Sequence, residues 1–184
     1  MREPAPQRKA PRGRAPARGA ARSKLKPVRG LFAVRCRPAA EPAVAGALRR
    51  LGSVRRLEPH DVILVELPDT RREAAAVKKL QAWHREGRVE FFTPVFCDEE
   101  TRLLRILTDE ITVRFKPDVP VTRRASIQRK LGVDTLRQNE FVPDQRVVKV
   151  SQPTGLKTLE VARALDRSPD VAYATPNYIS ELQR

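Results

Sequence analysis

The residues best suited to bind a metal or to act as nucleophile and base are two cysteines and two histidines: Cys36, Cys97, His60 and His84. Thiolates and imidazoles are common Zn²⁺ ligands, but they normally occur in pairs spaced as C-x-x-C or H-x-x-x-H. No two of these four residues are spaced in that way. A general base must also lie within hydrogen-bond reach of its nucleophile, and nothing in the sequence indicates such a pair. We therefore expect no metal, no other cofactor and no catalytic activity.

A disulfide between the cysteines is not expected either. Cys36 lies near the end of a predicted strand, and Cys97 lies beyond the end of a second one at 89–93. If the two strands pair antiparallel, about 3.3 Å per residue places the cysteines roughly 15 Å apart, which is too far for a disulfide. Cys36 is instead predicted to be a small core residue. The expected absence of a disulfide agrees with a reducing cytoplasm.

Two stretches of the chain predict the same first strand. LFAVRCRP, from Leu31, and EITVRFKP, from Glu110, both alternate apolar and polar side chains and then reach a proline. A strand with one buried face has this pattern. The side chains predicted to face the core are Phe32, Val34 and Cys36 in the first copy and Ile111, Val113 and Phe115 in the second.

The elements that follow also agree between the two copies. Each first strand precedes a short helical pattern that ends in basic residues and then Gly52 or Gly132, as expected of a left-handed C-terminal cap. The middle strands are expected within 57–67 and 136–150, and a second helix and a closing strand at 89–93 or 171–175 follow. We predict an α+β fold of two tandem ferredoxin-like βαββαβ units, at 31–104 and 105–184, each with helices on one face of an antiparallel sheet.

Residues 1–30 are predicted to form a separate basic arm. They contain ten Lys/Arg, five prolines and a single acid, Glu3, in a chain whose net charge is +15. Such a segment buries too little apolar surface to offset the entropy lost on ordering, so we expect it to be disordered. We expect at most weak, salt-sensitive contacts between this arm and nucleic acid or another polyanion.

The sequence has neither the apolar core of a secretory signal nor the apolar run of a membrane span. We therefore expect a cytoplasmic protein without a membrane partner.

The second copy resembles the N-terminal prodomain of subtilisin-like serine peptidases, in particular the fervidolysin-like type. The resemblance rests on LTDEITVRFKPDVP at 107–120 and ALDRSPDVAYATPNY at 164–178, with RKLG at 129–132 and RVVKVS at 146–151 between them. It covers roughly residues 105–180, and 31–96 only as a diverged copy in which Phe96 occupies the position of Tyr178. The resemblance implies a ferredoxin-like domain that assists folding of the peptidase and inhibits it until it is cleaved away.

The resemblance also implies a binding site. In this family the open face of the sheet packs on the peptidase, and the segment after the last strand lies in the substrate cleft. The corresponding face residues are Arg114, Lys116, Ala172 and Ala174. In the first copy the pleat separates two neighbouring phenylalanines: Phe91 matches Tyr173 and is predicted to be buried like it, whereas Phe92 is predicted to point to the open face as a contact residue. The corresponding inhibitory tail is Asn177, Tyr178, Ile179, Ser180, Glu181, Leu182, Gln183 and Arg184.

The end of this tail departs from the family, whose terminal residues are usually apolar. The ending Glu181-Leu182-Gln183-Arg184 implies either a peptidase that prefers basic residues at its cleavage position or a tail without an inhibitory role.

The 184 residues contain none of the catalytic motifs of a subtilisin-like peptidase, D-[ST]-G, H-G-T and G-T-S. Asp69-Thr70, for example, is followed by Arg71. We therefore expect a stand-alone prodomain-like protein that binds a subtilisin-like peptidase in trans, as an inhibitor or a folding chaperone.

Two other functions remain open from the sequence. The units could form a protein-interaction scaffold that pairs with another protein without inhibiting a protease. They could also be a tandem RNA-binding module, because RNA-recognition domains share this fold and use basic sheet faces. Against RNA binding, the outward positions of the first strands are Arg35, Arg37, Arg114 and Lys116, with no aromatic residue among them.

Overall fold

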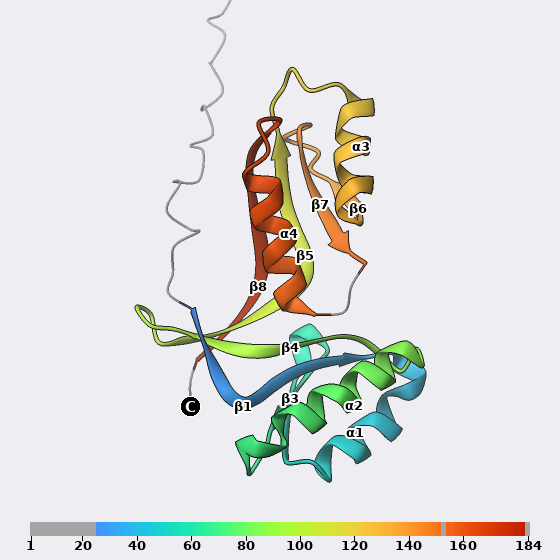
Figure 1. Cartoon of the computed structure of the whole chain (residues 1–184), viewed down its shortest axis with the longest axis vertical. Coiled ribbons are helices and arrows are strands. Elements are labelled where there is room, and N and C mark those ends of the chain that lie inside the picture. The colour runs from blue at the N-terminus through green and yellow to red at the C-terminus, as the bar shows by residue number, and fades with distance from the viewer. Residues whose placement is uncertain (1–24, 152–153, 183–184) are drawn as a thin grey trace, which may run out of the picture.

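The chain folds into one series of elements that occurs twice (Figure 1). The computed structural model describes residues 25–151 and 154–182. Residues 1–24 of the predicted arm, and Gln183 and Arg184 of the predicted tail, lie outside the described residues. In the part of the chain that is described, no helix has the length and apolar character needed to cross a membrane.

The first half of the chain, residues 25–98, contains two helices and four strands: β1 (Leu25–Cys36), α1 (Glu41–Arg49), β2 (Ser53–Leu57), β3 (Val62–Glu66), α2 (Glu73–Arg85) and β4 (Val89–Asp98). The second half, residues 103–182, repeats this order: β5 (Leu103–Phe115), α3 (Val121–Leu131), β6 (Val133–Gln138), β7 (Gln145–Val150), α4 (Gly155–Asp166) and β8 (Val171–Leu182). Short 3₁₀ turns at Pro38–Ala40, Glu58–His60 and Thr70–Arg72 complete the first half. The fold is thus α+β, as predicted.

The strands form one eight-stranded sheet whose ladders are antiparallel. Its order is β2-β3-β1-β4 in the first half and β6-β7-β5-β8 in the second. The first and last strands of each half therefore pair, and the third strand lies on the other side of the first. The two halves are joined by pairing of Val95–Cys97 in β4 with Leu104–Ile106 in β5.

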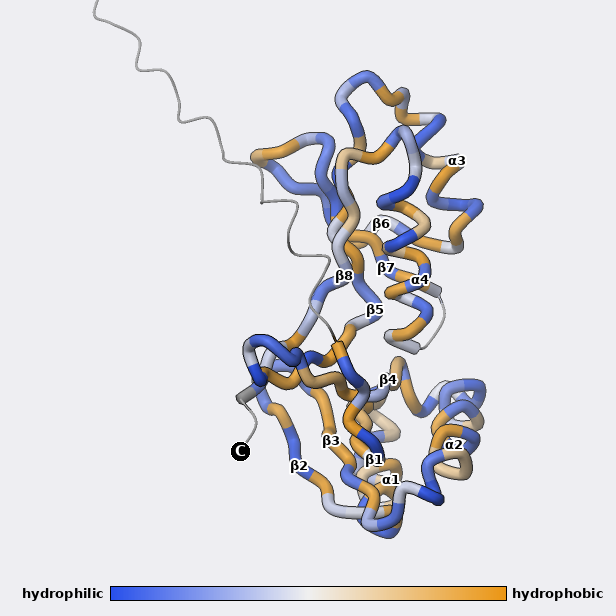
Figure 2. Tube along the Cα trace, turned by 60° about the vertical axis from the view of Figure 1, so that its left-hand side comes forward, coloured by the Kyte–Doolittle hydropathy of each residue, from blue (hydrophilic) through white to orange (hydrophobic). Residues whose placement is uncertain are grey.

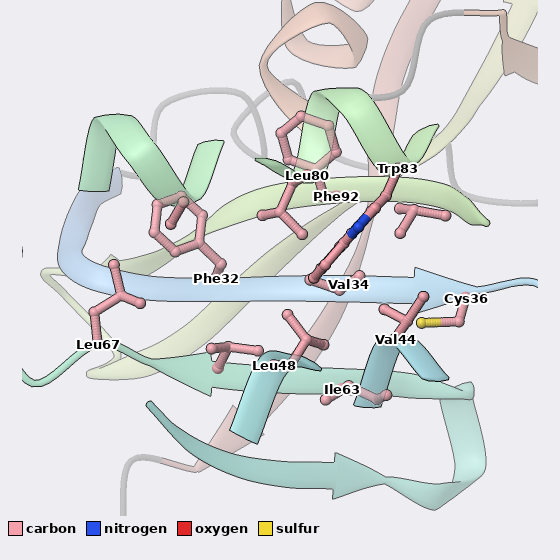
Figure 3. Packing of buried hydrophobic residues seen from close by; sticks show 13 residues of the cluster. Phe32, Val34, Cys36, Val44, Leu48, Ile63, Leu67, Leu80, Trp83 and Phe92 are labelled. Atoms are coloured by element: carbon pink, nitrogen blue, oxygen red, sulfur yellow. The ribbon is translucent and has the colours of Figure 1, made fainter. Parts of the chain in front are cut away.

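Each half has its own apolar core between its helices and one face of its sheet. In the first half Phe32, Val34 and Cys36 pack with α1 and α2 (Figure 3). In the second half Ile111, Val113 and Phe115 pack with α3 and α4. The strand alternation read from the sequence is confirmed for all six side chains, because a half-buried strand directs alternate residues to the core.

A bulge at the same position in both halves reverses the alternation of the last strand. In the first half Cys36 lies opposite Val89 and Arg35 opposite Phe91, so Glu90 is the extra residue. In the second half Phe115 lies opposite Val171 and Arg114 opposite Tyr173, so Ala172 is the extra residue. A bulge places two residues against one, and the following side chains change faces.

The bulges correct two predicted positions. Phe92 and Ala174 were expected on the face away from the helices, but both belong to the helix-covered cores. Conversely Phe91 and Tyr173, expected in those cores, lie on the opposite face, across from Arg35 and Arg114.

The prolines expected to end the closing strands lie inside them. Pro94 is opposite Phe32, and Pro176 is opposite Ile111. A further shift in register follows each proline, after which β4 continues to Asp98 and β8 to Leu182. The closing strand predicted at 171–175 therefore extends to Leu182, and Asn177–Leu182 of the predicted tail are part of the sheet.

The elements also begin earlier than predicted. Strand β1 starts at Leu25, inside the segment assigned to the basic arm, and Leu25–Pro27 pair with Phe96–Asp98. The middle strands start at Ser53 and Val133, directly after their helices.

The two glycines that were expected to cap helices differ in their roles. Gly132 has the predicted left-handed φ of 63°. Gly52 has a different role, because a Cβ there would lie 1.9 Å from the carbonyl oxygen of Glu66.

A third apolar cluster lies on the face of the first-half sheet that points away from α1 and α2, which we call the inner face. Four strands of the first half contribute residues to this cluster, and Leu104, Ile106 and Ile179 of β5 and β8 cover them. All of Val62–Val65 in β3 are consequently buried, although they alternate between the two faces. The orange stretch along β3 in Figure 2 corresponds to this strand, which is buried on both sides.

Candidate functional site

The face of the second-half sheet that points away from α3 and α4 is the main exposed sheet surface, and we call it the open face. Figure 2 shows the two helices on one side of the upper half and the strands on the other. Because strand residues alternate, the side chains opposite the core set lie on this face. They are partly exposed, and they include Thr112 and Arg114 of β5, Val147 and Lys149 of β7, and Tyr173 and Thr175 of β8.

Part of the open face is ordered by a polar network. The Thr112 hydroxyl donates to Oδ1 of Asn177 at 2.9 Å, and Nδ2 of Asn177 donates to a carboxylate oxygen of Glu110 at 3.1 Å. Arg137 of β6 lies 3.8 Å from the same carboxylate oxygen. Partners on three strands thus hold Glu110 and Asn177, so the centre of the face presents a fixed arrangement of side chains.

The structure places the predicted face residues in two groups. Arg114 lies on the open face, and Lys116 and Ala172 are exposed at the end of the sheet near it. Phe92 and Ala174 do not lie on this face, as described above. Tyr173 was missed, since strict alternation from Val171 predicts it to be buried, and the bulge at Ala172 leaves no clear signal in a single sequence.

The segment Tyr178–Leu182, which we call the closing segment, does not form a free tail. It pairs with Leu103–Leu107 of β5. Ile179 is 5% exposed and packs in the inner-face cluster. Glu181 forms an ion pair with Arg55 of β2, with 2.7 Å between Nη1 and Oε1, and Arg105 donates to the Ser180 hydroxyl. Burial raises the pKa of Tyr178 above its usual value, and the nearby Arg105 acts in the opposite direction.

The junction between the two halves contains a buried carboxylate. Asp109 is 4% exposed, lies 3.1 Å from Nζ of Lys149, and lies 3.8 Å from Nη1 of Arg35. Arg35 also lies over the ring of Phe91, with its guanidinium carbon 5.0 Å from the ring centroid. These contacts join β1 of the first half to β5 and β7 of the second.

The hairpin between β6 and β7 presents the most exposed aromatic side chain of the described residues, Phe141, which is 92% exposed. Its backbone is nevertheless ordered. Oδ1 of Asn139 accepts hydrogen bonds from the amides of Phe141 and Val142, at 2.9 and 3.1 Å. Asp144 pairs with Arg124 of α3 at 2.8 Å. An aromatic side chain held in water by an ordered loop is a candidate protein contact.

The two cysteines of the first half lie apart, and one of them is buried. Cys36 is buried, and burial raises the pKa of its thiol to about 12, with a smaller contribution from Glu41. Cys36 and Cys97 lie at opposite ends of the β1–β4 ladder and are not joined by a disulfide. Within residues 25–151 and 154–182, no three His, Cys, Asp or Glu side chains gather as a metal site.

Residues 105–177 match the family model of the fervidolysin N-terminal prodomain. No curated protein and no solved structure matches the chain. The matched region begins inside β5, at residue 105, ends inside β8, at residue 177, and includes the open face. The match is thus to a prodomain of a subtilisin-like peptidase, which is a non-catalytic part of such proteins. The closing segment lies just beyond it.

Proposed function

We propose that the second half of the chain, which carries the fervidolysin prodomain match at residues 105–177, binds a subtilisin-like serine peptidase on another chain. Binding would inhibit the peptidase or assist its folding. The observation that carries the proposal is that this region has a sheet face which its own helices leave uncovered. A prodomain that acts through its sheet needs such a face.

In this proposal each half is a ferredoxin-like unit, and the chain is a tandem pair. The support is the shared element order, the shared strand order and the bulge at corresponding positions, Glu90 and Ala172. A fold built from two βαβ units with an antiparallel sheet has this order of elements. The inner face of the first unit is occupied within the chain, which leaves the open face of the second for a partner.

The open face has the composition of a protein-binding surface. Arg114 and Tyr173 lie opposite each other on β5 and β8, and both residue types are enriched at interface hot spots. Val147 and Thr112, which lie opposite each other on β7 and β5, provide a weakly polar area next to them. Lys149 and Arg137 make the other side of the face basic, although Asp109 and Glu110 partly neutralise them.

A binding titration tests the proposal. The full chain would be titrated against a panel of subtilisin-like peptidases whose catalytic serine is chemically blocked. We expect Arg114→Glu and Tyr173→Ala each to weaken binding to a responsive member at least about tenfold, since large hot-spot residues contribute about 2 kcal/mol or more. Arg129→Glu, on the exposed side of α3, is the matched charge reversal and should leave affinity unchanged. Lack of binding to every member of a broad panel would contradict the proposal.

The second candidate is a protein-interaction scaffold without protease inhibition, and Phe141 favours it. A phenylalanine that is 92% exposed on an ordered hairpin has no role in either core. If a member of the peptidase panel binds at this hairpin instead, Phe141→Ser would weaken that binding at least about tenfold, whereas Arg114→Glu would not. The same titration with Phe141→Ser therefore distinguishes a binding site at the hairpin from one on the open face.

A further inference from the structure

The ladder between β5 and β8 is divided into two parts. Leu103–Leu107 pair with Tyr178–Leu182, and Ile111–Phe115 pair with Val171–Pro176. Between them Thr108, Asp109 and Glu110 lie opposite Asn177 alone. The Thr108 hydroxyl donates to the Asn177 carbonyl at 3.2 Å, so a side chain provides a bond where the regular ladder is interrupted. Where the pairing of two strands is interrupted, the residues on one side of the interruption can separate while those on the other side stay paired.

The two parts of the ladder belong to different apolar cores. Ala174 packs in the second-half core, whereas Ile179 packs against the inner face of the first half. Separation of the closing segment therefore removes its pairing with Leu103–Leu107 of β5 and its contacts with the first half. It leaves the second-half core, including Val113 and Leu165, in place.

Side chains alone connect the closing segment to the far edge of the first-half sheet. Arg55 forms an ion pair with Glu181, and Leu57 and Ile179 belong to the same inner-face cluster. In the described part of the chain, no backbone ladder joins β2 to β8. One ion pair and apolar contacts therefore hold the closing segment near β2. Both can separate without breaking hydrogen bonds of the β2–β3 ladder.

We propose that the closing segment is an autoinhibitory latch, which opens separately from the rest of β8. When closed, it covers the inner face of the first half and is unavailable to a partner. When open, it extends the strand that carries Tyr173 and Thr175, directly beside the open face. This proposal rests on the proposed function, because the opened segment becomes available to the peptidase that binds the open face.

Hydrogen exchange of the full chain tests the latch without any partner. Arg55→Glu places a negative charge against Glu181, so we expect exchange of the amides of 178–182 to accelerate at least about tenfold, while those of 111–115 are unchanged. Arg56→Glu is the matched control, because Arg56 is the next residue of β2 but pairs with Glu41 and Asp61 within the first half. The double variant Arg55→Glu/Glu181→Arg should restore slow exchange. If 178–182 exchange only together with 111–115 in every variant, the latch does not exist.

A reversible crosslink tests the coupling to the peptidase. Arg105 and Ser180 lie directly opposite each other, so Arg105→Cys/Ser180→Cys in a Cys97→Ser background can lock the closing segment to β5. We expect peptidase affinity to be at least about fivefold lower for the oxidised than for the reduced protein. Ser53→Cys/Glu66→Cys, a cross-strand pair in the first half, should show no such difference. Equal affinity in both redox states would overturn the coupling.

The experiments distinguish failure of the proposed function from failure of the autoinhibitory role. If neither redox state binds any peptidase, the proposed function fails, and the exchange experiment alone decides whether the latch opens. If both states bind equally, the proposed function stands and the autoinhibitory role does not.

Discussion

Arg55 and Glu181 lie 126 residues apart in the chain and form an ion pair across the point where the first-half sheet closes on the end of β8. The pair joins the outermost strand of the first half to the last strand of the second. Together with Ile179, the pair places the closing segment against the inner face of the first half, while the backbone of this segment pairs with β5 of the second half. The first half therefore holds a segment that the sequence predicts to be free.

Truncation of the side chain at the centre of this contact should destabilise the protein. Ile179→Ala removes a side chain that is 5% exposed from the inner-face cluster, and we expect a loss of about 2 to 4 kcal/mol of unfolding free energy. Urea denaturation followed by circular dichroism measures it. Leu156→Ala, at a position that is 47% exposed, should change the value by less than about 1 kcal/mol. Equal effects of the two substitutions would contradict the placement of Ile179.

The carboxylate of Asp109 should stabilise the junction. Asp109→Asn removes the charge of a buried anion that is shared by the Lys149 ammonium and the Arg35 guanidinium, whose own side chains are 44% and 24% exposed. We expect a loss of about 1 to 3 kcal/mol, which urea denaturation would show. Asp118→Asn, at an exposed position, should be nearly neutral. A neutral Asp109→Asn would mean that the junction does not depend on this charge.

The Cys36 thiol should make the protein less stable at alkaline pH. Burial raises its pKa from 9.0 to about 12, so between these values the unfolded chain ionises while the folded chain keeps the proton. Stability from this group is complete below pH 9.0 and is lost as the pH rises toward 12, by about 1.4 kcal/mol per pH unit. Unfolding free energies measured from pH 8 to 10, below the range in which the partly buried Tyr178 contributes, should show this slope, and Cys36→Ala should remove it. Cys97→Ser is the control and should retain it.

Two glycines of the first half should respond to alanine in opposite directions. A Cβ at Gly52 would lie 1.9 Å from the Glu66 carbonyl oxygen, so Gly52→Ala should cost about 2 kcal/mol or more. Gly46 is inside α1 with nothing within 4 Å of its Cβ position, and Gly46→Ala should stabilise by about 0.5 to 1 kcal/mol. Thermal unfolding of the two variants would show midpoint shifts of opposite sign; shifts of the same sign would refute this account of α1 and β3.

The repeated order of elements and the helix-facing cores could be predicted because they depend on local periodicity. Phe32 and Ile111 begin alternating patterns that only a strand with one apolar face explains, and Gly132 ends a helix as the capping rule requires. The family match lies where the resemblance placed it, over 105–177.

The orientation of the last strands could not be predicted from periodicity, because it depends on bulges. One extra residue at Glu90 and one at Ala172 exchange the faces of Phe91 and Phe92 and of Tyr173 and Ala174. A further signal was present in Val62-Ile63-Leu64-Val65. An unbroken apolar run in a short strand indicates burial on both faces, and here the covering residues include Ile179.

The most direct test of the central claim is inhibition of a subtilisin-like peptidase by the full chain. Peptide hydrolysis by each member of a broad panel would be measured against increasing concentrations of the protein and of its Arg114→Glu and Arg129→Glu variants. The account predicts competitive inhibition of at least one peptidase, an inhibition constant raised at least about tenfold by Arg114→Glu, and no change with Arg129→Glu. Inhibition that is equally strong with Arg114→Glu, or hydrolysis unaffected across the panel, would contradict it.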